Sequence, residues 1–414
     1  MSEWKSLSII TSKIGSGSTP RGGNSVYSDS GISFIRSQNV LDMDFSTENL
    51  AFINDSQAEK LNNVIVEKND ILLNITGDSI ARCTVVPEEI LPARVNQHVS
   101  IIRCKNTEES KYVMYYLQYM KKYLLQISKV GGTRNALTKE AIGKLPIKIS
   151  DDCNKISKIL DNIDQKIQTN NQINQELEAM AKILYEYWFV QFDFPDQNGK
   201  PYKSSGGKMV YHPELKREIP EGWGVEKLGE LAQFKNGINY EKTSSGSEKV
   251  KIINVRNISS STIFINQTDL DEIFLENDKS TNFIVNEGMI LITRSGIPGA
   301  TRLVSELEAK TVYSGFIIAS EVNDLIYKNL IFYYLKNVEE VLKNQSAGTI
   351  MKNISQSVLT DMAVSLPPQN VLLKFNSIID DLLEQMKNVQ RQNQELTQLR
   401  DWLLPMLMNG QVII

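Results

Sequence analysis

Loops rich in Arg, Lys, Asn, Gln and hydroxyl residues carry the most evident chemistry in this sequence. Arg can form paired hydrogen bonds with guanine, and Asn or Gln with adenine, whereas Lys, hydroxyls and backbone N–H groups bind phosphates. In the first half of the chain such side chains occur in the stretches 16–21, 36–39, 76–82 and 131–135. In the second half they occur in 235–240, 256–257, 294–302 and 348–353. These stretches are therefore candidate contacts with a nucleic acid.

Individual candidates within these stretches share a side chain that can reach a base edge or a phosphate. The first half supplies Ser16, Thr19, Arg21, Arg36, Gln38, Asn39, Arg82, Thr133, Arg134 and Asn135. The second half supplies Lys235, Asn239, Tyr240, Arg256, Asn257, Arg294, Ser295, Arg302, Thr349, Lys352 and Asn353. For any single Arg, an ordinary solvated or salt-bridged surface position is an equally open interpretation. Asn39 and Asn257 are also suited to hold a turn, because Asn side chains hydrogen-bond to nearby backbone groups.

Motifs for catalysis are weak or missing. The run Gly77–Ile80 is similar to the nucleophile block of one hydrolase family, but a hydrolase needs a partnering histidine, and the chain has only His98 and His212. His98 falls in a predicted strand and is most simply structural. The run Gly15–Thr19 lacks the lysine with which a P-loop grips phosphates. NPPY- or DPPY-like tetrapeptides, a Walker lysine loop and a nuclease carboxylate–lysine cluster are also absent from the sequence. The sequence therefore indicates a protein without a catalytic site.

Length and composition predict a multi-domain protein without a membrane segment. A chain of 414 residues exceeds what one hydrophobic core usually organises, and its 41% hydrophobic residues are ordinary for a globular protein. The longest apolar runs, such as Ile71–Leu73, are too short to cross a bilayer, and the amino terminus lacks a signal core. Cys83, Cys104 and Cys153 form no CxxC pair, which favours buried thiols in a reducing compartment over disulfides or a zinc site. We therefore expect a cytoplasmic protein without a metal or cofactor.

Charge is unevenly distributed along the chain. The formal net charge is −4, which by itself speaks against a nucleic-acid partner. Residues 1–150 nevertheless hold 18 Lys and Arg against 15 Asp and Glu, whereas residues 151–195 hold 4 against 8. Residues 221–365 hold 14 against 18. The second half must therefore gather its positive side chains on one face if it binds DNA.

An internal repeat at an offset of about 219 residues organises the chain. Val66–Leu73 recurs as Val285–Ile292, and Phe34–Val40 recurs as Ile252–Ile258. Shorter matches connect Thr76-Gly77 with Ser295-Gly296, Gly132-Thr133 with Gly348-Thr349, and Asn174–Leu177 with Asn393–Leu396. Each copy combines short β-rich runs, polar Gly-containing loops and one amphipathic helix, followed by a long helical segment.

Two long helical segments occupy equivalent places in the repeat. The first starts near Asp151 and Asp152, which are good N-cap residues, and the second follows Pro367-Pro368. The apolar positions of the first are Ile156, Ile159, Leu160, Ile163, Ile167, Ile173, Leu177, Met180 and Leu184. Those of the second are Phe375, Leu382, Val389, Leu396 and Leu403, seven apart, with Ile378, Ile379, Met386, Leu399 and Leu407 beside them. This pattern predicts a coiled-coil pair, although one face of a globular core helix would look similar.

Asn174 and Asn393 interrupt these apolar stripes at repeat-equivalent positions. In an antiparallel pair related by a pseudo-two-fold axis, equivalent residues can meet only near that axis. A buried Asn pair there would fix the helix register at some cost in stability. We therefore expect replacement of both by Leu to raise thermal stability and to loosen the register, and a clear fall in stability would contradict this hypothesis.

The sequence around the end of the first long helix resembles a known family. The segments Leu184–Pro195, Ser205–Val210, Leu215–Trp223 and Val225–Gly229 resemble the central region of type I restriction–modification specificity subunits. Leu399–Gln411 resembles the second helical region of the same family and its ending. The resemblance covers essentially the whole chain.

This resemblance implies an α+β fold in which two mixed α/β target-recognition domains are separated by two long antiparallel coiled-coil helices. The expected domains are 1–150 and 223–365, with helical regions at 151–195 and 366–414 and a linker at 196–222. Each recognition domain would bind one half of an asymmetric, interrupted target in double-stranded DNA. The helices would set the spacing of the halves and dock two adenine-N6 methyltransferase subunits, which restriction subunits then join.

Two other classes of function stay open at this point. A coiled-coil scaffold would join proteins without touching DNA, and a fused methyltransferase–specificity enzyme would carry its own active site. The missing methyltransferase tetrapeptide and the limited length weigh against the enzyme. Binding to duplex DNA that weakens steeply with salt would distinguish a DNA-binding protein from a scaffold.

Overall fold

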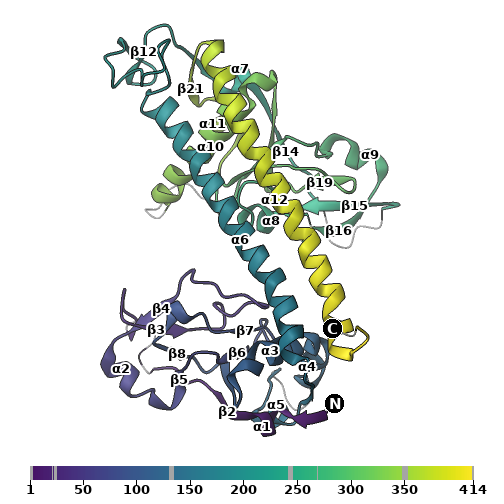
Figure 1. The fold of residues 1–414 in the computed structure, drawn as a ribbon. Helices are drawn as coiled ribbons and strands as arrows, with labels where there is room; N and C mark the ends of the chain where they lie inside the picture. The colour runs from purple at the N-terminus through teal and green to yellow at the C-terminus, as the bar shows by residue number, and fades with distance from the viewer. Residues whose placement is uncertain are drawn as a thin grey trace. The chain divides into compact units, whose positions relative to one another are not determined.

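The computed structural model describes residues 3–20, 22, 26–129, 135–240, 246–267, 269–346 and 353–412. The chain forms two compact units, which contain the elements labelled in Figure 1. Unit 1 comprises Met1–Asn170 and Gln392–Ile414, and unit 2 comprises Asn171–Arg391. Unit 1 therefore combines the two ends of the sequence.

Unit 1 is built on two four-stranded sheets. The first is antiparallel, in the order β2 (Thr11–Ser16), β9 (Val99–Cys104), β6 (Ile71–Asn74) and β7 (Cys83–Val85). The second has the order β4 (Ala51–Ile53), β3 (Ile32–Ile35), β8 (Ala93–Val95) and β5 (Ile65–Val66), with β3 and β8 parallel. In addition, β1 (Glu3–Ser6) pairs with β10 (Pro146–Ile149).

The helices of unit 1 pack on its two sheets and connect the strands. They are α1 (Leu7–Ile10), α2 (Asp55–Glu59), α3 (Ser110–Tyr119), α4 (Lys121–Ile127) and α5 (Lys139–Gly143). The apolar run of β6 is fully buried, and it shares a core with Tyr112, Val113 and Leu117 of α3. Asn54 and Thr138 cap α2 and α5 by accepting hydrogen bonds from backbone N–H groups of the first turn.

Unit 2 repeats this architecture, which confirms the internal repeat predicted from the sequence. Its four-stranded antiparallel sheet has the order β14 (Ala232–Asn236), β20 (Ile317–Val322), β17 (Ile290–Thr293) and β18 (Thr301–Leu303). A second sheet has the order β16 (Asp271–Leu275), β15 (Glu248–Ile253) and β19 (Thr311–Tyr313), with β15 and β19 parallel. β13 (Gly224–Lys227) pairs with β21 (Ala363–Leu366). The helices are α7 (Leu228–Leu231), α8 (Val255–Ser259), α9 (Asn277–Ser280), α10 (Lys328–Ser346) and α11 (Gln356–Thr360).

Two long helices, α6 (Cys153–Tyr185) and α12 (Gln369–Asn409), run through both units (Figure 1). Within unit 1, Arg400 of α12 donates a hydrogen bond to Asp164 of α6 at 2.8 Å, and Asn170 of α6 donates one to Asn393 at 2.9 Å. Because the partner's number falls as the α6 number rises, these two segments are antiparallel. Within unit 2, aromatic residues of the carboxyl end of α6 pack on Phe375 of α12.

The apolar stripes of these helices are only partly buried. Phe375, Ile379, Leu382 and Met386 are buried in unit 2, and Leu404 and Leu407 are buried in unit 1. Ile173 and Met180 on α6, and Ile378 and Leu399 on α12, are exposed. These four positions are therefore not buried in a seam in the described structure, and the coiled-coil pair remains a prediction.

The stretch predicted as a linker, 196–222, contains a two-stranded hairpin of β11 (Met209–His212) and β12 (Arg217–Pro220). It follows a π-helical turn, Glu186–Val190, that ends α6. Trp223 after the hairpin packs edge-on against Phe192 before it, with ring centroids 5.4 Å apart. The two ends of the stretch are therefore held together in the core of unit 2.

Two predictions from composition can be compared with the described residues. Cys83, Cys104 and Cys153 are buried and free, which confirms the prediction of buried thiols. Among the helices that the structure describes, none has the length and apolar character needed to span a membrane.

Candidate nucleic-acid interface

Polar loops of unit 1 meet around an open hollow of about 850 Å³. The lining comes from the turn after β3, the β6–β7 loop, the β8–β9 loop and the segment before α5. Its residues are Ser37, Gln38, Thr76, Gly77, Asp78, Ser79, Arg82, His98, Asn135 and Ala136. Most of these side chains donate or accept hydrogen bonds, so the hollow suits a ligand with many polar atoms, such as the edges of bases.

A buried asparagine, Asn39, holds the turn that carries Gln38. Its Oδ1 accepts a hydrogen bond from the backbone N–H of Arg36 at 3.0 Å, and its Nδ2 donates to the carbonyl of Ser46 at 2.9 Å. Asn74, also buried, donates a further hydrogen bond to the same turn. Because these amides satisfy buried backbone groups, the turn is fixed while Gln38 stays exposed.

Glycine allows the first polar stretch to lie directly on the β8–β9 loop. A Cβ atom at Gly17 would collide with the carbonyl oxygens of Val95 and Asn96. In unit 2, a Cβ atom at Gly237 would collide in the same way with two carbonyl oxygens at the carboxyl end of β19. Only glycine fits at these two equivalent positions, so both units bring the same loops together.

In unit 2 the same scaffold presents different side chains. The backbone N–H of Arg294 donates to the carbonyl of Phe316 at 2.8 Å, as that of Ile75 donates to His98 at 2.9 Å. Phe316 therefore stands where unit 1 has His98. Phe316 is 63% exposed and Ile297 in the neighbouring loop is 40% exposed. This part of the surface is accordingly more apolar in unit 2 than in unit 1.

Comparison with known protein families identifies the family to which this duplicated architecture belongs. A family model described as "Type I restriction modification DNA specificity domain" matches the chain twice, over residues 12–179 and 220–398. The chain belongs to this specificity family.

Known members of the specificity family match most of the chain. The sequence is 27% identical over 333 residues to the type I restriction enzyme MjaIX specificity subunit of Methanocaldococcus jannaschii, covering 78% of this chain and 73% of the relative. It is 23% identical over 343 residues to the HindI specificity subunit of Haemophilus influenzae, covering 68% and 72%. The fold is similar to that of the type I S subunit from M. genitalium, with a TM-score of 0.54 at 14% identity, covering 98% of this chain and 96% of that one.

The predicted contact residues of this specificity-family chain differ in exposure. Those at the surface are Ser16, Thr19, Gln38, Asn135, Lys235, Asn239, Arg256 and Asn353. Those that are half-buried are Arg36, Arg82, Tyr240, Arg294 and Ser295. Arg21, Thr133, Arg134, Thr349 and Lys352 lie outside the described residues. The surface and half-buried residues remain predictions for DNA contact.

Some of the accessible cations are already engaged within the protein. The Nζ of Lys235 lies 2.9 Å from a carboxylate oxygen of Glu321. The guanidinium of Arg36 donates to the carbonyl of Asn49 at 2.6 Å and lies over the ring of Tyr27, 5.6 Å from its centroid. A contact with phosphate would have to compete with these interactions, which makes both residues weaker candidates than their charge suggests.

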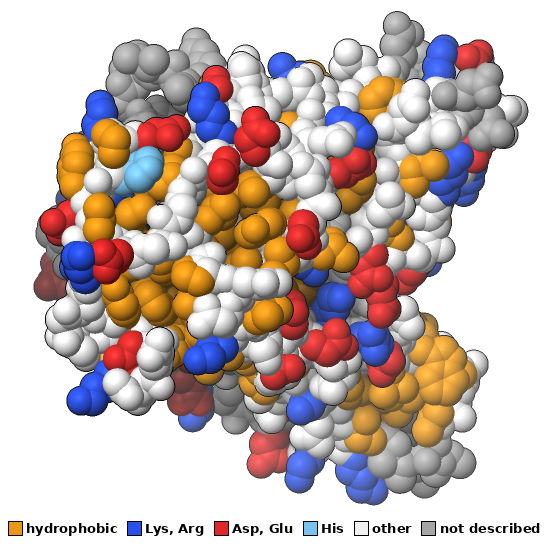
Figure 2. All heavy atoms as spheres, turned by 90° about the horizontal axis from the view of Figure 1, so that it is seen from above, with side chains coloured by type: hydrophobic (Ala, Val, Ile, Leu, Met, Phe, Trp, Pro, Cys, Tyr) orange, Lys and Arg blue, Asp and Glu red, His pale blue; other side chains and the backbone are white. Residues whose placement is uncertain are grey.

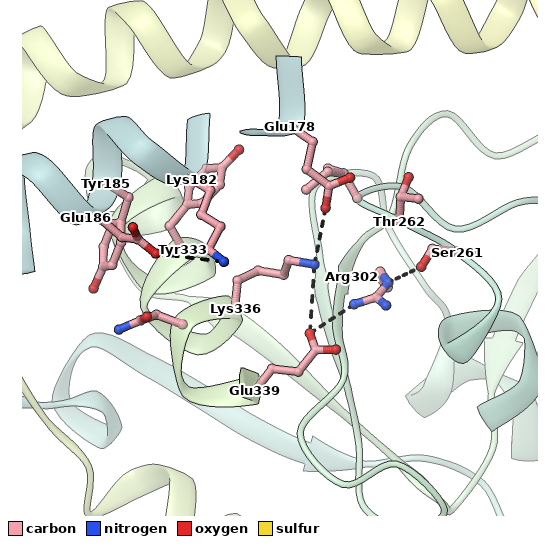
Figure 3. A pocket seen from close by; sticks show the side chains of 12 residues that line it. Glu178, Lys182, Tyr185, Glu186, Ser261, Thr262, Arg302, Tyr333, Lys336 and Glu339 are labelled. Atoms are coloured by element: carbon pink, nitrogen blue, oxygen red, sulfur yellow. Dashed lines mark hydrogen bonds and ion pairs between the residues drawn. The ribbon is translucent and has the colours of Figure 1, made fainter. Parts of the chain in front are cut away.

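Arg302 does not fit its predicted role in DNA contact, because it is 6% exposed on strand β18. Its guanidinium donates to Glu339 at 3.1 Å and to the carbonyl of Ser261 at 2.6 Å (Figure 3). Figure 3 shows Lys336 between Glu178 of α6 and Glu339 of α10, with nitrogen–oxygen distances of 3.6 and 3.8 Å. Burial lowers the pKa of Lys336. This cluster borders a cavity of about 240 Å³ and ties α6 and α10 to the sheet of unit 2.

Asn39 and Asn257 are also buried, which corrects their assignment as DNA contacts. The Oδ1 of Asn257 accepts from the backbone N–H of Asn254 at 2.8 Å, and its Nδ2 donates to the carbonyl of Asp269 at 2.9 Å. Both asparagines hold turns, which is the interpretation that the sequence had left open.

Four residues at the loops were not among the individual candidates: Asp78 and Ile297, which lie within the candidate stretches 76–82 and 294–302, and His98 and Phe316, which lie outside all of the candidate stretches. His98 was interpreted as structural and Asp78 as part of a decoy motif, yet both line the hollow of unit 1. The side chains of Thr76 and His98 lie 2.6 Å apart. The repeat alignment could have found them, because these residues flank strands that are equivalent in the two copies.

Charge at the surface is mixed. On the face shown in Figure 2, Lys and Arg side chains are interspersed with Asp and Glu. Among the described residues, no group of three or more His, Cys, Asp or Glu is placed to hold a metal ion. The polar loops are therefore the candidate interface, since the face in Figure 2 shows no continuous basic patch over the part of the chain that the structure describes.

Proposed function

We propose that this chain is the DNA sequence-specificity subunit of a type I restriction–modification complex and binds an asymmetric, bipartite target, one half at each domain. The observation that carries the proposal is the pair of equivalent loop scaffolds, which present different side chains at matching positions, such as His98 and Phe316. A duplicated scaffold suits two half-sites. Different reading residues make the two halves different in sequence.

The long helices would act as a ruler between the two recognition domains. α6 has 33 residues and α12 has 41, which correspond to about 50 and about 60 Å at 1.5 Å per residue. Paired as an antiparallel coiled coil, they would space the domains by about one turn of DNA, ~34–36 Å. The domain boundaries that go with this proposal are 1–150, 151–195, 196–222, 223–365 and 366–414.

The outer faces of the same helices would dock the methyltransferase subunits. In unit 2, α6 and the turn after it expose Ile173, Met180, Ile183, Tyr187 and Val190. In unit 1, α12 exposes Leu399 and Trp402 at the positions equivalent to Met180 and Ile183. A repeated apolar stripe suits two copies of one helical partner. The restriction subunits would then join through this complex, and the chain itself would contribute no catalysis.

The proposal is tested by co-expressing the chain with the methyltransferase subunit encoded beside it in a host free of adenine methylation. Sequencing of N6-methyladenine across the genome should give one interrupted motif, methylated on both strands. A stable complex without methylation would favour the scaffold function instead.

A paired variant tests the docking faces separately. Met180→Asp with Leu399→Asp should abolish co-purification of the methyltransferase subunit, whereas Lys158→Asp, a polar position elsewhere on α6, should not. Retention of the partner by the double variant would contradict docking on these stripes.

A further inference from the structure

The exposed residue just before the buried asparagine differs between the two equivalent turns. Unit 1 has Gln38 before Asn39, and unit 2 has Arg256 before Asn257. The two asparagines make matching hydrogen bonds: each Oδ1 accepts from the backbone N–H three residues earlier, at 3.0 and 2.8 Å, and each Nδ2 donates to a backbone carbonyl at 2.9 Å. Gln38 and Arg256 therefore occupy the same place on two copies of one scaffold.

Gln38 presents its amide at the rim of the polar hollow. It is exposed and lines the hollow together with Arg82 and Asn135. Its Nε2 lies 3.4 Å from the carbonyl oxygen of Asn49, which is longer than a typical hydrogen bond and therefore weak. The amide can leave this contact at little cost. One carbonyl and one NH₂ group match the N6 and N7 atoms of adenine in the major groove.

Arg256 is held in place by two carboxylates. Its Nη1 lies 2.9 Å from Asp269 and its Nη2 lies 2.7 Å from Asp271, and the side chain is 50% exposed. The carboxylates offset the positive charge, which weakens attraction to phosphates. They also fix the guanidinium, which reduces the conformational entropy lost when it binds a base. Nη1 donates to the carboxylate of Asp269, and Nη2 donates to the carbonyl of Asp269 and to the carboxylate of Asp271. The remaining N–H groups of the guanidinium can donate to O6 or N7 of guanine.

From these observations we infer that Gln38 and Arg256 are equivalent base-reading residues, the first for an adenine in one half-site and the second for a guanine in the other. This assignment rests on the proposed function, because it requires that the loops face the major groove. Arg256 then acts as a base contact and not as a phosphate contact, and Asp269 and Asp271 are positioning residues for it.

Exchange of the two side chains provides the test, read out by the methylated motif of the co-expressed complex. Gln38→Arg should replace one adenine by guanine in one half-site only, and Arg256→Gln should replace one guanine by adenine in the other half only. Arg391→Gln is a matched control, because Arg391 is also 50% exposed and paired with a carboxylate, that of Glu306. It should leave the motif unchanged.

The outcomes separate this inference from the proposed function. If the wild-type complex gives no motif, the proposed function fails. If the wild type gives a motif that both exchange variants retain, or if a change appears in the wrong half-site, the base assignment is overturned while the proposed function stands.

Binding measurements keep the test decisive where a variant no longer supports methylation. With wild-type complex, replacing the assigned base pair in a duplex should weaken binding about fivefold to 150-fold, because a paired base contact discriminates by about 1–3 kcal/mol. Arg256→Gln should remove this discrimination and leave the salt dependence of the affinity unchanged. A fall in the salt slope by about one, with discrimination retained, would identify Arg256 as a phosphate contact and overturn the assignment.

Discussion

Asn170 of α6 donates a hydrogen bond from Nδ2 to Oδ1 of Asn393 of α12, across 2.9 Å. Its side chain also lies 3.4 Å from Gln392, and Asn170 is almost fully buried. The repeat predicted that Asn174 would meet Asn393. Within unit 1, the residue that contacts Asn393 is Asn170, which lies one helical turn before Asn174. The Oδ1 of Asn174 is buried without a hydrogen-bond partner among the described residues. The role of Asn174 in the helix register remains a prediction.

Removal of one member of the Asn170–Asn393 pair should cost more stability than removal of both. Asn170→Leu removes the hydrogen bond that Oδ1 of Asn393 accepts, so we expect a loss of about 1–3 kcal/mol in the free energy of unfolding. The double Leu variant should recover most of this loss. Urea denaturation of the two variants measures the difference, and additive losses would contradict a direct interaction.

Arg400 should be essential for the stability of unit 1, because it neutralises a buried carboxylate. Asp164 accepts hydrogen bonds from Arg400 at 2.8 Å and from the hydroxyl of Tyr115 at 2.5 Å, and the side chains of Asp164 and Arg400 are 11% and 14% exposed. Arg400→Met should destabilise the protein by about 3–5 kcal/mol. The second change Asp164→Asn should restore much of that loss, and no restoration would exclude the charge explanation.

The loss of stability caused by Arg400→Met should also depend on pH. Burial raises the pKa of Asp164, while the hydrogen bonds from Tyr115 and Arg400 oppose the rise. Without Arg400 the pKa rises further. When the pKa of a carboxyl is higher in the folded state than in the unfolded state, the protein loses stability as the pH rises from the lower pKa to the higher one. The difference in melting temperature between variant and wild type should therefore shrink from pH 7.5 towards pH 4.5.

Replacement of Asn39 or Asn257 by aspartate should destabilise the protein. The Nδ2 of Asn39 donates to the carbonyl of Ser46, so Asn39→Asp places an anionic oxygen against a carbonyl oxygen. We expect a greater loss of stability from Asp than from Ala, which removes the hydrogen bonds at about 1–3 kcal/mol. Asn257 makes the matching hydrogen bonds, so its variants should show the same order. A lower cost for Asp than for Ala at either position would contradict the proposed hydrogen bonding.

Arg302 should behave as a structural residue of unit 2. Its ion pair with Glu339 joins two side chains that are 8% and 4% exposed, so Arg302→Ala leaves a buried carboxylate and should cost about 3–5 kcal/mol. Arg391→Ala removes an exposed pair and should cost at most about 1 kcal/mol. Guanidinium denaturation compares the two variants. Equal, small losses would restore Arg302 as a candidate DNA contact.

The cysteines should be unreactive in the native protein. Burial raises the pKa of Cys104 to about 11 and raises that of Cys83 as well. Because the thiolate is the reactive form, its fraction at pH 8 is on the order of one in a thousand for Cys104. Iodoacetamide at pH 8 should therefore label both residues only after denaturation, as measured by mass spectrometry of peptides. Rapid labelling of the native protein would show that these thiols are accessible.

Local patterns in the sequence are sufficient to predict the two-fold repeat and the long helices of this protein. The repeat is visible as ordered pairs of segments such as Phe34–Val40 and Ile252–Ile258, because equivalent strands and turns impose the same local hydrophobic spacing and the same turn residues. Asn39 and Asn257 could also be singled out from local chemistry. The long helices follow from apolar periodicity, which depends on residues close together in sequence.

Which candidate side chains are available to a partner depends on the tertiary packing, and local sequence patterns do not reveal it. The sequence alone does not distinguish Arg302 from Arg256. In the structure, Arg302 is buried against Glu339 of α10, whereas Arg256 is exposed beside Asp269 and Asp271. Apolar periodicity likewise could not separate the exposed Leu399 from the buried Leu407. Burial depends on which distant elements pack against a position, and that information is not contained in local spacing.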